Sequence, residues 1–189
     1  MRKIILLILC MALIIVSGCA SQIASRATPS GEQHGAEVME WLDFSDRENM
    51  PWNDTLELEV PEFPNIVFTW RWDSITATDH NGEFVLFQGV PISQVFLADI
   101  TGDGLPDFVA TVSVGSGIVD NRVLVYDFVN NELYELSNRA VYNYSLLMDN
   151  GNLFVLQTPS SGAPWNGVPE NSQKGELEII DGKLAMINH

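Results

Sequence analysis

The hydrophobic positions after residue 60 alternate with polar positions in short runs. Residues 66–72 are mostly β-branched or aromatic, a composition that favours an extended strand. Residues 79–82 and 149–152 are typical of the tight turns that join antiparallel neighbours. The same pattern predicts further strands at residues 74–78, 83–88, 94–98, 108–114, 122–128, 142–148, 153–158, 176–180 and 184–187.

We therefore predict an all-β domain over residues 62–189, an antiparallel meander of about ten short strands. It forms a sandwich, a barrel or a partial propeller-like arrangement, because a complete propeller needs at least about four blades of four strands. A long polar segment at residues 160–173 interrupts the strands. Trp165 within it is a candidate ligand-binding side chain, and the alternative is that its ring folds back on the core as a lid.

The N-terminus has a different pattern. Arg2 and Lys3 precede an uncharged apolar run at residues 4–16, which is shorter than the roughly 20 residues that a membrane-spanning helix needs. The run ends in Val16-Ser17-Gly18-Cys19-Ala20, which resembles the lipobox of bacterial lipoproteins. The resemblance implies that residues 1–18 are a signal peptide and that Cys19 carries a covalent diacylglycerol. An ordinary secretory signal with a chance cysteine, or an uncleaved anchor, is the alternative.

Residues 19–61 are predicted to be the lipidated N-terminus and a flexible tether. Residues 20–50 are rich in Ser, Ala, Gly, Gln and Glu, and few of them are β-branched. Residues 35–42 allow one or two helical turns, and Pro51 and Pro61 prevent a longer helix. A tether of this kind holds the domain away from the membrane surface.

The charge of the chain limits the kinds of partner that it can bind. The formal net charge is −16, from 25 acidic and 9 basic residues, so binding to the phosphates of nucleic acid is excluded. Anionic lipids would also repel the domain, so we expect attachment to the extracytoplasmic face of the cell membrane through lipid at Cys19. Cys10 is removed with the signal peptide, which leaves no pair of thiols for a disulfide.

An acidic loop between two predicted strands is the candidate metal site. Gly102 and Gly104 give the loop the backbone freedom that a tight turn needs. Alternate positions offer the oxygen ligands that Ca²⁺ prefers, from the side chains of Asp99, Thr101, Asp103 and Asp107 and the carbonyl group of Leu105. An EF-hand is excluded, because Ala110 occupies the position of its bidentate Glu. The alternative is a metal-free turn in which the Asp side chains cap backbone N–H groups.

The loop resembles the calcium loop of FG-GAP and VCBS-type repeats, although only one copy is present. That resemblance implies that Asp99, Thr101, Asp103 and Asp107 surround the ion. Together with residues 63–70, 111–120 and 125–127, the loop also resembles an extracytoplasmic module of clostridial type. Such modules form the outer C-terminal regions of β-lactam-sensor-type membrane metallopeptidases and also occur alone. The sequence has no His-Glu-x-x-His motif, so the resemblance implies an accessory or sensing module rather than a peptidase.

The sequence does not predict an enzyme. His34, His80 and His189 lie in the tether, in a turn and at the terminus, where none is placed beside a nucleophile. We expect a non-catalytic, calcium-stabilised domain that binds or senses something at the envelope. A hydrolase of cell-wall glycan or peptide, and an accessory partner of a membrane protein, are the alternatives.

Overall fold

The computed structural model describes residues 37–44, 49–115, 120–160 and 171–188. Every described residue belongs to one compact unit, His34–His189. These residues form thirteen strands and no helix, so the prediction of an all-β fold is confirmed. Across the same residues, no helix has the length and apolarity that crossing a membrane requires.

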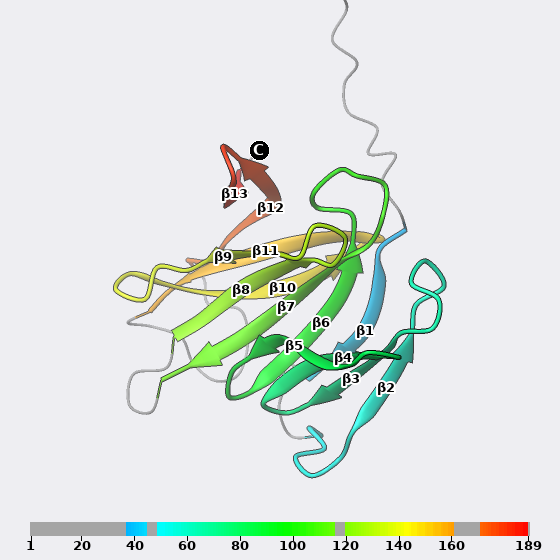
Figure 1. The fold of residues 1–189 in the computed structure, drawn as a ribbon. Coiled ribbons are helices and arrows are strands. Elements are labelled where there is room, and N and C mark those ends of the chain that lie inside the picture. Colours follow the sequence, from blue (N-terminus) through cyan, green and yellow to red (C-terminus); the bar gives the residue numbers. More distant parts are fainter. Residues whose placement is uncertain (1–36, 45–48, 116–119, 161–170, 189) are drawn as a thin grey trace, which may run out of the picture. The chain divides into compact units, whose positions relative to one another are not determined.

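The strands form three open antiparallel sheets (Figure 1). The N-terminal sheet consists, in spatial order, of β2 (Leu56–Glu59), β3 (Val67–Arg71), β4 (Ser74–Asp79) and β5 (Gly82–Gln88). The central sheet consists of β1 (Met39–Asp43), β6 (Ile92–Ala98), β7 (Asp107–Val114), β8 (Asp120–Asp127) and β9 (Glu132–Leu136). The C-terminal sheet consists of β10 (Tyr142–Asp149), β11 (Asn152–Pro159), β12 (Gln173–Ile180) and β13 (Lys183–Ile187). The arrangement is sandwich-like, and the barrel alternative is wrong.

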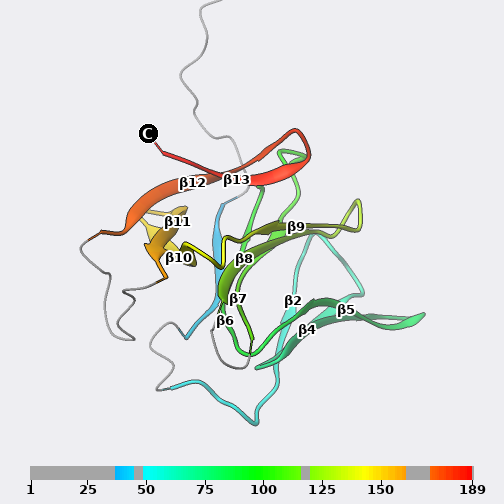
Figure 2. The same ribbon diagram turned by 90° about the vertical axis from the view of Figure 1, so that its left-hand side faces the viewer.

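The central sheet lies between the other two, and its strands β6 and β7 are buried on both faces (Figures 1 and 2). Along β7, Phe108 and Ala110 belong to the core shared with the N-terminal sheet. Val109, between them, belongs to the core shared with the C-terminal sheet. A strand covered on both faces reads as a nearly continuous apolar run, which explains why every β7 residue except Val114 is buried.

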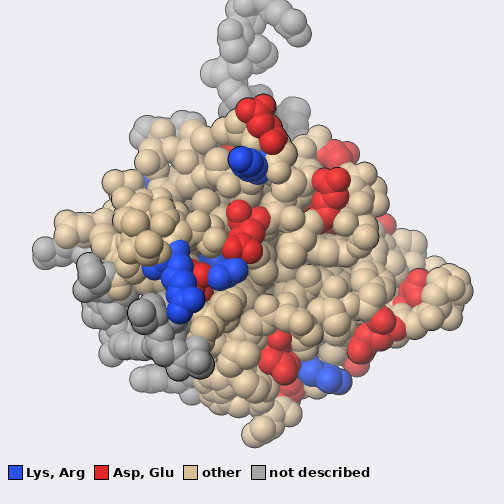
Figure 3. Space-filling view, turned by 60° about the vertical axis from the view of Figure 1, so that its left-hand side comes forward, with Lys and Arg blue, Asp and Glu red and all other residues tan. Residues whose placement is uncertain are grey.

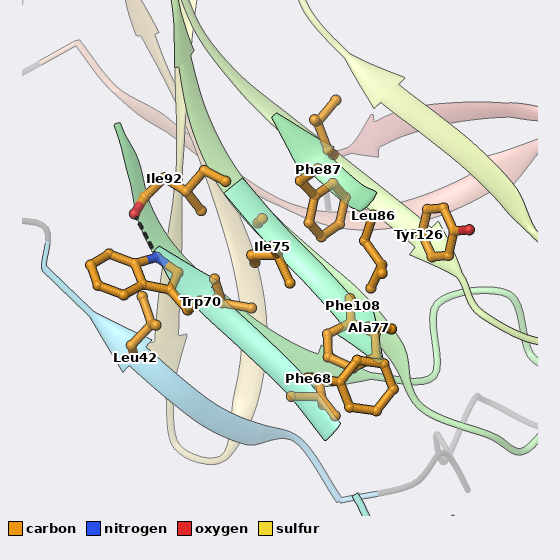
Figure 4. Close-up of a cluster of buried hydrophobic side chains, with 14 of the residues drawn as sticks. Leu42, Phe68, Trp70, Ile75, Ala77, Leu86, Phe87, Ile92, Phe108 and Tyr126 are labelled. Atoms are coloured by element: carbon orange, nitrogen blue, oxygen red, sulfur yellow. Dashed lines mark hydrogen bonds between the residues drawn. The ribbon is translucent and has the colours of Figure 1, made fainter. Parts of the chain in front are cut away.

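The first core joins the N-terminal and central sheets (Figure 4). Phe68 and Trp70 project from β3 into this core and are fully buried. The indole Nε1 of Trp70 donates a hydrogen bond to the carbonyl oxygen of Ile92 at 3.1 Å. The bond satisfies the one polar group of a large buried ring and fixes β3 against the start of β6.

Gln94 joins the central and C-terminal sheets. Its side chain is buried, and its Nε2 donates to the carbonyl oxygen of Leu146 at 2.9 Å. The Oε1 atom accepts from the backbone N–H of Leu146 at 3.0 Å and from the Thr111 hydroxyl at 2.9 Å. The amide group therefore pairs with β10 as the backbone of a neighbouring strand would.

Part of the predicted tether belongs to the domain. β1 and β2 both lie within residues 19–61, and β1 pairs with β6 from Met39 opposite Leu97 to Asp43 opposite Gln94. The helical turns expected at residues 35–42 are therefore wrong for residues 39–42. Tertiary packing decides this segment, because Leu42 is buried in the first core. Strand β9 is the third strand that the hydrophobic pattern did not predict.

Candidate functional site

The acidic loop connects β6 to β7 and is closed by its own backbone amides. Asp107 is the first residue of β7, and its side chain is buried. Its Oδ2 accepts from the backbone N–H groups of Ile100 and Thr101, each at 2.8 Å. The Thr101 hydroxyl donates to Oδ1 at 3.3 Å. This carboxylate therefore ties the entry of the loop to its exit.

The two other carboxylates of the loop also cap amides. Asp99 accepts from the N–H of Gly102 at 2.7 Å and from the N–H of Gly104 at 3.0 Å, one on each oxygen. Asp103 accepts from the N–H of Leu105 at 2.8 Å. Both glycines have positive φ, at 77° and 87°, a backbone conformation that side chains disfavour.

This geometry agrees with the metal-free alternative, in which the Asp side chains serve as turn caps. Over the described residues, no three His, Cys, Asp or Glu side chains gather in a way that could hold a metal ion. Binding of Ca²⁺ by Asp99, Thr101, Asp103, Leu105 and Asp107 stays a prediction from the sequence.

Burial perturbs the titration of Asp107. Loss of solvent raises the pKa of its carboxyl group from 3.8 to about 6. The hydrogen bonds from Thr101 and Ile100 act in the opposite direction, because they stabilise the charged form. The negative charge of Asp127 adds a smaller upward contribution. The loop therefore contains an acid that titrates close to neutrality.

A second feature, which the sequence did not predict, is a groove beside β5. The groove has a volume of about 550 Å³ and is lined by β5, the end of β7, β8 and β9, with Val85, Val114, Arg122, Leu133 and Glu135 among its residues. Val85 is 48% exposed and Leu133 is 53% exposed. No periodic signal could have located this groove, because it depends on where the N-terminal sheet ends.

Arg122 is held in the groove by two carboxylates. Its Nη2 pairs with the buried Asp120, and its Nη1 pairs with Glu135 at 2.8 Å. Two buried atoms of this group, Arg122 Nε and Asp120 Oδ1, have no hydrogen-bond partner within the described structure. The two ion pairs thus fix the guanidinium group in position.

Of the remaining candidates, His80 is the one that the structure describes. His80 is in the turn between β4 and β5, its side chain is 85% exposed, and its ring lies 3.9 Å from Asp79. Cys19, His34, Trp165 and His189 lie outside the described residues. Comparison with family models, curated proteins and solved structures finds no match for this chain.

Proposed function

We propose that this protein is a lipid-anchored module that presents a non-catalytic β-domain for binding or sensing at the extracytoplasmic face of the cell membrane. The observation that carries the proposal is the ordered N-terminal sequence: basic residues, a short apolar run, small residues and Cys19. Two acyl chains on one cysteine give stable anchoring, where a single chain is marginal.

The fold makes the tether in this proposal shorter than the sequence predicted. Because the first strand begins at Met39, the segment between Cys19 and the domain is shorter than residues 19–61. If this segment of about 19 residues is the flexible tether that the sequence predicts, it would span about 24 Å root-mean-square. The domain would therefore work close to the membrane surface, within reach of other envelope proteins.

Two features support a binding role over a hydrolytic one. Among the residues that line the groove, Glu135 is the one carboxylate, and it is paired with Arg122. Glycoside hydrolysis by the usual route needs two carboxyl groups across the scissile bond. The exposed apolar side chains of Val85 and Leu133 favour contact with a partner.

Anchoring is tested with the full chain expressed in a bacterial host. We expect the intact mass to match a chain that begins at a diacylated Cys19, and radiolabelled palmitate to be incorporated. Cys19→Ser should abolish both labelling and membrane association. Cys10→Ser is the matched control, because the proposed cleavage removes that thiol. Equal labelling and membrane association of Cys19→Ser and wild type would refute the anchor.

A further inference from the structure

The N-terminal sheet is one strand short of covering the central sheet. The N-terminal sheet has four strands, the central sheet has five, and β5 is the terminal strand of the cover. Beyond β5, one part of the central sheet stays open toward the groove. We call this part the open strip; it consists of Val114, Arg122, Leu124, Leu133 and Glu135. Strand register places all five on the face that carries the first core.

Both borders of this groove are sheet edges. Strands β5 and β9 each end their sheet, so each has a row of backbone groups without a neighbouring strand. Natural proteins protect such edges with charged side chains or proline. Here Val85 on β5 and Leu133 on β9 are apolar and about half exposed. The same edges carry Glu83 on β5 and Glu132 and Glu135 on β9. A segment docked here would therefore meet apolar side chains at Val85 and Leu133 and negative charge beside them.

We infer that the groove binds an extended segment of a partner polypeptide, which pairs with β5 as a fifth strand and lies over the open strip. This inference rests on the binding role proposed above and names the kind of partner. Alternate side chains of a strand point to opposite faces, so apolar residues would face Leu133 and polar residues would face solvent.

The charge of the protein indicates which kind of polypeptide fits the groove. The chain carries 25 acidic and 9 basic residues, and Asp and Glu are spread over the surface shown in Figure 3, where several Lys and Arg gather in one cluster. A second copy pairing through β5 would bring two such acidic surfaces together, which is unfavourable. Residues 20–37 of this chain contain one large aliphatic residue, Ile23, and so lack the alternating pattern. The partner segment is therefore basic on its solvent face.

The probe for this inference is a fluorescein-labelled nonapeptide in which valine and lysine alternate. Its binding to the full chain in dodecyl maltoside is followed by fluorescence anisotropy at physiological salt. An analogue with proline in place of the central valine has the same charge but cannot pair as a strand. We expect the first peptide to bind and the proline analogue to bind at least about tenfold more weakly.

Variants then locate the site. Leu133→Lys should weaken binding about tenfold, whereas Val141→Lys, which is 46% exposed and outside the groove lining, should change it less than about twofold. Hydrogen exchange on the wild-type chain should show new protection in Gly82–Gln88 when the peptide is bound. This second measurement keeps the inference testable if Leu133→Lys fails to fold.

Three results would overturn the inference: no binding by wild type, equal binding of the two peptides, or equal effects of the two lysine variants. Dimerisation of wild type that Leu133→Lys abolishes would identify a second copy as the occupant instead. Failure of peptide binding would leave acylation of Cys19 unaffected, so the inference and the proposed anchor can fail separately.

Discussion

Gln94 provides the sharpest test of how the central and C-terminal sheets are joined. Replacing it with leucine keeps the volume of the side chain but removes three hydrogen bonds, two to Leu146 and one to Thr111. Three buried polar groups then lose their partner. Because each such group costs about 1–3 kcal/mol, we expect Gln94→Leu to lower the free energy of unfolding by at least about 3 kcal/mol. That is a large part of the roughly 5–15 kcal/mol that stabilises a typical domain.

The assay is equilibrium unfolding of the full chain in urea, followed by tryptophan fluorescence. Thr111→Val is the matched control, since it removes one of the three hydrogen bonds and leaves Gln94 paired with Leu146. We expect it to cost about 1 kcal/mol. If Gln94→Leu cost no more than Thr111→Val, water or a local shift would be satisfying the β10 backbone, and the bridging role would be refuted.

Three further outcomes are expected. Burial raises the pKa of Asp107 to about 6, so the protonated carboxyl group contributes fully to stability below about pH 4, and this contribution is lost as pH rises through 6. Relative to Asp107→Asn, the free energy of unfolding of wild type should fall by up to about 3 kcal/mol between pH 4 and 7. A difference in stability between the two proteins that does not change with pH would contradict this. Gly89→Ala should lower the melting temperature and reduce the free energy of unfolding by about 1–3 kcal/mol, because the added Cβ would lie 1.9 Å from Cγ1 of Val112. An unchanged melting curve would mean that Val112 moves aside without cost. If the acidic loop binds calcium, millimolar Ca²⁺ should raise the melting temperature of wild type and of the exposed control Asp54→Ala, but not of Asp103→Ala; no shift in any of the three would remove calcium from the account.

The strands that the sequence predicted are those whose own residues determine their conformation. β3 and β7 are rich in β-branched and aromatic residues, a composition that favours an extended strand. β1 has a pattern compatible with either a helical turn or a strand, and only pairing with β6, far along the chain, decides between them. β9 is short and mostly exposed, so its hydrophobic pattern is weak.

The candidate sites were predictable to different degrees. The sequence located the acidic loop, because closely spaced Asp and Gly residues form a compact loop whether they bind an ion or cap amides. It did not decide between those roles, since the same oxygens serve both. The groove depends on where β5 ends over the central sheet, a relation between Val85 and Leu133 that neither residue reveals by itself.

The pairing of β1 with β6 also bears on how the chain reaches its folded state. β1 precedes its partner along the chain, and β2 to β5 lie between them in sequence. A chain that is threaded across a membrane from its N-terminus would deliver β1 long before β6 arrives. The first core also needs β7 and β8, so the central sheet can close only after most of the domain has crossed. If the chain is exported in this way, the first core cannot close until β8 has crossed, so the polypeptide would stay unfolded and competent for translocation up to that point.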